Sequence, residues 1–465
     1  MSQDDTPRKN ILFVAYEFPP EGESGVQRSA KFSKYLPDFG YEPLVLTAAE
    51  RNTEKRIDTT LLADVQNTRI FRCRGYERFV VRLPDKVRLF RRLTKFWLRP
   101  DRNVLAWLPK AKQAALNIAK EYPISVIYTS VSPFSSAILG RRLKKLLGVP
   151  WVVDFRDPWV DDLVRLWPSR LHRLYESRLE RKVFEAADAI VVVTPTMKDM
   201  LASRYPQWAT KTHVICNGFD PQDFPRMEVA PPPDRLQIGY TGRLVEYERE
   251  MVAGRLGPLS RLWLSKIAFR DTSVDLSTHS PGYLLRAVRK LLDEHPDFED
   301  KILLRFAGIF HEKNMELVRE LQLENVVSVK GYLPHAESVR LLMESDVLFL
   351  PMTAWGGDRR SYIYSGKIFE YLASRRPILA AVPEGDARDL ITRARAGWCV
   401  DPHDEIAMKS LIKELIERKM AGTLNTSPDE QIIRQFDRRN LTRQLAAVFD
   451  SLTSIPSSAA TPVKR

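Results

Sequence analysis

The segment 361–373 combines residue types that can bind a phosphate and a sugar. Ser365 and Gly366 are small residues at the expected start of a helix, where unpaired backbone N–H groups attract an anion. Lys367 adds a positive charge at the same end. Glu370 follows one turn later, where a carboxylate can accept hydrogen bonds from vicinal sugar hydroxyls. This arrangement suits a nucleotide site. Spacing alone equally describes a helix start with a solvated lysine and a surface glutamate.

Two aspartates form a second candidate group. Asp154 and Asp157 follow the apolar run at 151–153, so we expect them at the end of a strand. There they would bind acceptor hydroxyls or a polar part of a donor. The alternative is that Asp154 caps the following turn, while Arg156 and Asp157 form an internal ion pair.

The common nucleotide and metal motifs are missing from the sequence. The first glycine loop, with Gly22 and Gly25, is not G-x-G-x-x-G, and no G-x-x-x-x-G-K-[ST] occurs. A nicotinamide dehydrogenase and the P-loop enzymes are therefore disfavoured. No H-E-x-x-H is present and no D-x-D pair follows a strand, so we expect chemistry without a bound metal or cofactor.

The elements that must position these residues alternate between strands and helices. β-rich apolar runs predict strands at 11–15, 43–47, 125–129, 151–154, 189–193, 213–215, 236–240, 302–308, 326–329, 347–350 and 377–381. Helices are expected at 26–39, 137–147, 281–292, 367–373 and 429–452. This order predicts an α/β protein of two facing Rossmann-like domains with an interdomain cleft.

The expected domains are separated by a proline-rich linker at 227–235. The first domain covers 1–226 and the second 236–430, followed by a helix at 431–452 and a disordered tail at 453–465. An insertion at about 245–280 is too long for a simple connection. It is basic and apolar, so we interpret it either as a membrane- or partner-contacting element or as a local lid or elaboration.

Charge adds a prediction about partners. The chain has 72 Lys and Arg against 59 Asp and Glu, a net charge of +13. Between Arg69 and Arg102, twelve basic residues face three acidic ones, so this stretch carries about +9. Apolar residues recur within it at helical spacing, which predicts a helix that binds an anionic membrane surface or packs on its own domain. Nucleic acid is disfavoured, because no zinc finger, RNA-binding strand motif or basic zipper accompanies the charge.

Targeting signals are not apparent. The sequence has no apolar run of membrane-spanning length, and its first residues lack the basic and apolar regions of a secretory signal. The three cysteines are far apart, so a disulfide framework is not expected. We expect a cytoplasmic protein, peripheral at the inner face of the plasma membrane.

Six motifs then occur in order along the chain, at Phe18–Arg28, Asp154–Trp159, Asn217–Asp220, Gly239–Arg243, Ser345–Pro351 and Gly366–Ala373. With these motifs the chain resembles family 4 of the retaining, GT-B-fold glycosyltransferases, from residue 11 to about 445. The resemblance implies that the last helix crosses back to the first domain. It also implies that the first domain binds the acceptor and the second binds the nucleotide-sugar.

The resemblance further implies roles for individual residues. Glu370 matches the second glutamate of the family's E-x7-E motif, which holds the nucleotide ribose. Ser365, Gly366 and Lys367 match the turn whose amides meet the donor diphosphate, and Arg243 matches the basic residue that neutralises it. Gly22 and Gly25 match the first-domain loop that closes toward the donor.

Three positions depart from the family pattern. The first glutamate of E-x7-E falls at Tyr362, so its contact to the donor sugar is missing or supplied elsewhere. A histidine often found after the fourth strand has no counterpart at 128–132, and the family's second basic residue has only Arg249 as a candidate.

Taken together, the residues and the resemblance predict a metal-independent, retaining glycosyltransferase of the hexosyltransferase type. It would move a sugar from a nucleotide-sugar to a glycan or lipid-linked acceptor in cell-envelope or exopolysaccharide biosynthesis. Arg243 and Lys367 are its predicted catalytic residues. The alternatives are a sugar-nucleotide epimerase of the same fold and a catalytically silent sugar-nucleotide-binding protein.

Overall fold

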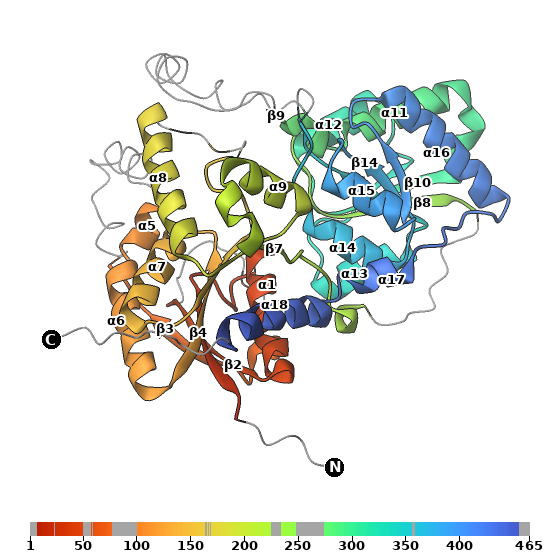
Figure 1. The fold of residues 1–465 in the computed structure, drawn as a ribbon. Helices are drawn as coiled ribbons and strands as arrows, with labels where there is room; N and C mark the ends of the chain where they lie inside the picture. The colour runs from red at the N-terminus through yellow and green to blue at the C-terminus, as the bar shows by residue number, and fades with distance from the viewer. Residues whose placement is uncertain are drawn as a thin grey trace, which may run out of the picture. The chain divides into compact units, whose positions relative to one another are not determined.

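The protein forms two units, each built around a parallel sheet (Figure 1). The computed structural model describes residues 7–22, 24–49, 57, 59–76, 100–162, 165, 167, 169–224, 234–247, 274–355 and 359–454. Unit 1 holds the described residues up to 217 and those from 438 onward, and unit 2 holds those from 218 to 437. Within the described ranges, the chain passes from unit 1 to unit 2 after residue 217 and is back in unit 1 from residue 438.

Unit 1 contains a seven-stranded sheet of order β3-β2-β1-β4-β5-β6-β7. All its strand pairs are parallel. The strands are β1 Lys9–Ala15, β2 Tyr41–Ala48, β3 Arg69–Cys73, β4 Ile124–Val131, β5 Trp151–Phe155, β6 Ala189–Val192 and β7 Thr212–Val214. The helices are α1 Ser24–Tyr35, α2 Leu61–Val65, α5 Arg102–Leu105, α6 Leu108–Glu121, α7 Ser135–Leu147, α8 Arg170–Ala186, α9 Pro195–Arg204 and α18 Arg438–Thr453.

The core of unit 1 explains why the last helix belongs to it. α18 contributes Leu441, Leu445 and Phe449 to the same buried cluster as Phe13 of β1 and Tyr128 of β4. Burying these apolar side chains removes them from water, which is the main favourable term in folding.

Unit 2 contains a six-stranded sheet of order β11-β10-β8-β12-β14-β15, again parallel throughout. Its strands are β8 Leu236–Arg243, β10 Ile302–Ile309, β11 Val327–Val329, β12 Val347–Pro351, β14 Ile378–Ala381 and β15 Gly397–Val400, with the antiparallel pair β9 Val274–Asp275 and β13 Ala354–Trp355 beside it. Its helices are α11 Gly282–Glu294, α12 Glu312–Glu320, α13 His335–Glu344, α14 Gly366–Ser374, α15 Asp386–Arg393, α16 Glu405–Met420 and α17 Glu430–Arg434. Two Rossmann-like α/β domains confirm the predicted fold class.

Several sequence predictions fall on residues outside the described ranges. They are the linker at 227–233, most of the insertion at 248–273 with Arg249, the centre of the basic stretch at 77–99 and the tail from 455. The ends of the basic stretch form β3 and α5. The single helix expected at 429–452 is two helices, α17 and α18.

None of the helices in the described ranges has the length and apolar content needed to cross a membrane.

Candidate functional site

The predicted phosphate-binding residues of unit 2 meet at the carboxyl end of its sheet. β8 ends at Arg243, and α14 begins at Gly366 directly after the connection from β12 and β13. A Cβ atom placed on Gly242 would lie 2.7 Å from Lys367 Nζ. The lysine ammonium therefore contacts the backbone at the end of β8. Lys367 Nζ also lies 5.3 Å from the centre of the Tyr240 ring. The structure thus brings Arg243 and Lys367, far apart in sequence, to one edge.

The backbone of two neighbouring strands makes room for this arrangement. Gly242 has φ +130° and pairs with Gly308, which has φ +112°. A Cβ on Gly308 would approach the Gly242 carbonyl oxygen to 2.1 Å, so no side chain fits there. Both residues adopt conformations that are open to glycine and strained for other residues. The Tyr240 hydroxyl fixes the turn by donating a hydrogen bond of 2.8 Å to the Arg243 carbonyl oxygen.

The start of α14 is open in the way an anion site requires. Ser365 is the N-cap residue, and its side chain makes no capping hydrogen bond. Gly366 is exposed, and a Cβ added to it would have nothing within 4 Å. The positive end of the helix dipole therefore faces open space, beside the Lys367 side chain.

Lys367 and Glu370 influence each other electrostatically. Burial lowers the pKa of Lys367, and the negative charge of Glu370 opposes that shift. Burial, with the charge of Glu370 as a second cause, raises the pKa of the Tyr240 hydroxyl above its ordinary range. Lys367, Glu370 and Tyr240 therefore belong to one local group, with a cation at the helix start and a carboxylate one turn further on.

His279 belongs to the same group, although it is not among the residues predicted from the sequence. It ends a 3-10 turn at Leu276–His279, and its carbonyl oxygen accepts a hydrogen bond from the Val245 backbone N–H at 3.1 Å. Burial, reinforced by the nearby charge of Lys367, lowers the pKa of His279 to about 4. The imidazole is therefore neutral at physiological pH and presents one donor and one acceptor beside the lysine. No sequence motif surrounds His279 that could have singled it out.

Tyr362 occupies the position where the resemblance expects a carboxylate. Its side chain is only 5% exposed, and its ring packs on Trp355 with centroids 5.1 Å apart. The backbone next to it is fixed because Ser361 exchanges hydrogen bonds with the chain at 384–386. Tyr362 is thus a buried packing residue of unit 2, held against Trp355.

In unit 1, the structure places Asp154 in the core instead of on the predicted substrate-binding surface. Asp154 is fully buried. Arg28 donates to both carboxylate oxygens, from Nε at 2.8 Å and from a terminal nitrogen at 3.1 Å, and the Tyr128 hydroxyl donates a further hydrogen bond. These buried partners occupy both carboxylate oxygens, so Asp154 has a structural role. It is an ion-pair partner of Arg28, and not the substrate ligand or the turn cap that the sequence suggested.

The other predicted residues of unit 1 lie near the surface. Asp157 is exposed and Gly22 is half-buried in the loop before α1. Gly25 contacts the guanidinium of Arg156 so closely that a Cβ would come within 0.9 Å of one of its nitrogens. Arg156 donates to the carbonyl oxygen of Val131 at 3.3 Å and to that of Ser132. The start of α1 and the residues after β5 therefore share one edge of this sheet.

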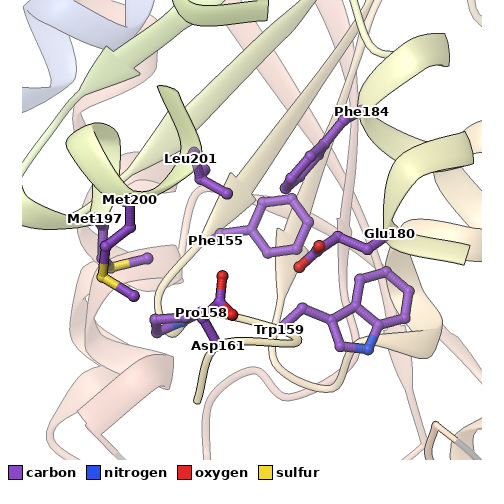
Figure 2. Close-up of a pocket in the computed structure, with 9 residues that line it drawn as sticks. All are labelled: Phe155, Pro158, Trp159, Asp161, Glu180, Phe184, Met197, Met200 and Leu201. Atoms are coloured by element: carbon purple, nitrogen blue, oxygen red, sulfur yellow. The ribbon is translucent and has the colours of Figure 1, made fainter. Parts of the chain in front are cut away.

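A pocket of unit 1 is too small to hold a substrate. Figure 2 shows it between the side chains of α8, those of α9 and the loop that follows β5, lined by Phe155, Pro158, Trp159, Asp161, Glu180, Phe184, Met197, Met200 and Leu201. Its cavity of about 10 Å³ has room for roughly one water molecule. The pocket is therefore a packing feature of the core.

One lining residue of this pocket is an unusual acid. Burial raises the pKa of Glu180 to about 7, although the charge of Arg204 opposes the shift. The carboxylate accepts hydrogen bonds from the Val160 backbone N–H at 3.1 Å and from the Tyr205 hydroxyl at 3.0 Å. Glu180 thus anchors the loop after β5 to α8.

Among the residues that the structure describes, no group of three or more histidine, cysteine or acidic side chains is arranged to hold a metal ion.

Comparisons with known proteins bear on both units. The family model of the glycosyl transferase 4-like domain matches residues 25–218, and that of glycosyl transferases group 1 matches residues 276–418. WcaL of Salmonella typhimurium, which is assigned to colanic acid biosynthesis as a glycosyltransferase, is 25% identical over 171 residues. That match covers 36% of this chain and 41% of the length of WcaL.

Two solved structures share the fold over nearly the whole chain. Sucrose-phosphate synthase of Thermosynechococcus elongatus has a TM-score of 0.60 at 15% identity and covers 96% of this chain and 100% of its own. Anabaena HepE, solved in complex with UDP-glucose, has a TM-score of 0.56 at 15% identity and covers 95% of this chain and 100% of its own. With a 4-like domain in unit 1 and a group 1 domain in unit 2, the chain belongs to the GT-B glycosyltransferases.

Proposed function

We propose that the protein is a retaining, metal-independent glycosyltransferase that uses a nucleotide-sugar donor. The observation that carries this proposal is the meeting of Arg243, Lys367 and the open start of α14 at one sheet edge, with Glu370 one turn further on. The family membership and the UDP-glucose in the related HepE structure support a donor of this class.

The chemistry of the leaving group explains why these residues are suited to the reaction. When the sugar–phosphate bond breaks, negative charge builds on the nucleoside diphosphate. Backbone N–H groups at the start of α14 and the Lys367 ammonium are fixed in place before the reaction, so they stabilise that charge without a reorganisation cost. Arg243 adds an exposed positive charge from the end of β8. Because burial lowers the pKa of Lys367, its ammonium is poorly solvated and gains from an anionic ligand.

Glu370 and His279 would hold the neutral parts of the donor. A carboxylate accepts two hydrogen bonds from the vicinal hydroxyls of a ribose, and Glu370 is at the distance of one helix turn from the phosphate-binding end. His279, neutral beside Lys367, offers a donor and an acceptor to a sugar hydroxyl. This placement would compensate for the aromatic residue at Tyr362.

The acceptor is proposed from the relatives. WcaL belongs to the biosynthesis of an exopolysaccharide, colanic acid, which supports a glycan or lipid-linked acceptor in cell-envelope or exopolysaccharide biosynthesis. A hexosyl donor and a cytoplasmic location, peripheral to the inner face of the plasma membrane, complete the proposal. Unit 1 would bind the acceptor through the exposed edge that carries Gly25 and Asp157.

A silent sugar-nucleotide-binding protein is the second candidate, because Tyr362 replaces a carboxylate and is buried against Trp355. Such a protein would bind nucleotide without cleaving a donor. An epimerase of the same fold would release an isomerised sugar without any acceptor.

Calorimetric titration with nucleoside diphosphates, paired with donor-hydrolysis rates, tests the proposal. We expect Lys367→Ala and Arg243→Ala to lower donor turnover roughly a hundredfold, since each removes charge from the developing diphosphate. The exposed Lys313→Ala is the matched control and should behave as wild type. Nucleotide binding without donor cleavage would favour the silent protein, and unaltered turnover in both site variants would contradict the proposed site.

A further inference from the structure

Helix α8 of unit 1 buries two carboxylates and exposes apolar side chains, the reverse of the usual pattern of a surface helix. Its buried side carries the carboxylates of Glu176 and Glu180, which are 0% and 1% exposed. Its outer side carries Leu171, Leu174 and Tyr175, which are 75%, 47% and 51% exposed. A surface helix normally hides its apolar residues and exposes its charges, so this outer face needs an explanation.

The buried carboxylates are accounted for by their partners. Glu176 accepts a hydrogen bond of 2.6 Å from the Trp159 indole N–H and lies 2.9 Å from an Arg165 guanidinium nitrogen. Glu180 is held by the Tyr205 hydroxyl and by the Val160 backbone. Both carboxylates are therefore bonded within the core of unit 1, and these contacts fix the orientation of α8.

The exposed apolar side chains are surrounded by cations. Arg170, Arg178, Arg181 and Lys182 are exposed on the same side of α8, and Glu185 is the single exposed acid among them. At about 100° per residue, these five residues and the three apolar ones fall within an arc of about 140°. None of the four cations has an ion-pair partner among the described residues, whereas Arg173, on the flank, pairs with Asp161 at 3.4 Å.

We propose that this outer face of α8, which we name the α8 face, docks on an anionic lipid bilayer. Leucine and tyrosine side chains would enter the boundary between head groups and acyl chains, while the arginines and the lysine contact the acidic head groups. A nucleic acid would use the cations and leave the two leucines in water, so it fits this composition less well. This docking rests on the peripheral membrane location in the proposed function and names the surface responsible for it, while the nucleotide site of unit 2 takes no part.

The position of the α8 face agrees with an acceptor held at a membrane. α8 ends at the amino end of the unit 1 sheet, because Asp188, just after it, donates from its backbone N–H to the Trp151 carbonyl oxygen at 2.9 Å. Its first turns, with Leu171, therefore lie toward the carboxyl end of the sheet, where Gly25 and Asp157 are found. A bilayer contacting the α8 face would present lipid-linked glycans to that edge.

Co-sedimentation with vesicles tests this proposal, with neither donor nor nucleotide present. The full chain should bind vesicles of phosphatidylcholine and phosphatidylglycerol, bind phosphatidylcholine vesicles weakly, and be released by raised salt. Arg170→Gln/Arg178→Gln/Arg181→Gln should lower the partition coefficient about a hundredfold, since each cation contributes roughly fivefold. Leu171→Ser/Leu174→Ser should lower it at least tenfold, at both low and physiological salt.

The matched control is Leu146→Ser. Leu146 is 54% exposed near the end of α7, where the neighbouring Lys144 donates a hydrogen bond of 2.6 Å to the Ala186 carbonyl oxygen at the far end of α8. This variant should partition as wild type. Unchanged partitioning of the leucine pair, or equal binding to neutral vesicles, would overturn the proposal. So would a concentration-dependent dimer that the same substitutions dissolve. Nucleotide titration of each variant should stay at the wild-type value, which separates a failed docking surface from a failed nucleotide site.

Discussion

Gly242→Ala offers a direct test of how the unit 2 site works, because it perturbs Lys367 without touching its charge. An alanine Cβ would lie 2.5 Å from Lys367 Cε and 2.7 Å from Nζ. Ordinary contacts begin at 3.4 Å, so the ammonium would have to retreat by about 0.7 Å. A displacement near 1 Å in a catalytic group can cost up to about a hundredfold in rate. We therefore expect donor turnover to fall by roughly ten- to a hundredfold.

Backbone strain must be separated from this displacement. Gly242 has φ +130°, so alanine there also costs roughly 1–3 kcal/mol of stability. Gly422→Ala is the control, since Gly422 has φ +68° and an added Cβ would find no other atom within 4 Å. It should lose about 1 kcal/mol in urea denaturation and keep full turnover.

A double-mutant cycle then identifies the cause. Lys367→Ala removes both atoms with which the new methyl group collides, so adding Gly242→Ala to it should cost no further turnover. Donor-hydrolysis rates of the wild type, the two single variants and the double variant supply the four corners. Independent, multiplicative losses would refute the reasoning, and so would a Gly242→Ala variant with wild-type turnover.

Three further predictions concern the carboxylates. Glu370→Ala should weaken nucleoside diphosphate binding by roughly 1–3 kcal/mol in calorimetry, because the ribose hydroxyls lose their acceptor. The exposed Glu320→Ala is the control and should bind as wild type. Equal affinities of the two variants would show that Glu370 does not contact the nucleotide. Asp154→Ala should cost about 3–5 kcal/mol of unfolding free energy, because it leaves the buried charge of Arg28 unpaired, and near-wild-type urea stability would contradict that role. The pKa of Glu180 is about 7 in the folded state against an ordinary 4.5, so between these pH values the folded state keeps a proton that the unfolded state has lost. The free energy of unfolding should therefore fall by roughly 3 kcal/mol as the pH rises through this range. Glu180→Gln should flatten that decline in urea denaturation at pH 4 to 8, and an unchanged slope would contradict the assignment.

The fold was predictable because buried parallel strands leave a clear pattern. β5, with the sequence from Trp151 to Phe155, is buried at every residue, and such continuous apolar runs indicate strands covered on both faces. β3 was missed for the opposite reason. It is the edge strand of its sheet, and its short apolar run is broken by two arginines, Arg69 and Arg72. In the sequence alone, these arginines are indistinguishable from the beginning of the basic stretch.

At the site too, contacts within one helix were predictable from the sequence, whereas contacts between segments far apart in the chain were less so. Lys367 and Glu370 lie within one helix turn, so their shared position follows from helical geometry alone. The approach of Lys367 to Gly242 follows from parallel topology, which brings strand ends and helix starts to one edge of the sheet. His279 joins them through a turn that no periodicity marks. The role of Asp154 depends on Arg28, 126 residues earlier in the chain, and no local pattern around the aspartate indicates that partner.

The ion pair of Arg28 also links the glycine loop of unit 1 to the end of the unit. Besides Asp154, the guanidinium donates to the carbonyl oxygens of Ile215 at 2.9 Å and Cys216 at 2.7 Å. It lies 3.4 Å from the amide oxygen of Asn217, the last residue before unit 2. Because the Arg28 guanidinium is buried and shared among these groups, a movement of α1 would release carbonyl oxygens at the point where the chain leaves unit 1. Arg28 thus couples the loop at Gly25 to residues 215–217, where the chain leaves unit 1, so a displacement of one segment would strain the hydrogen bonds of the other.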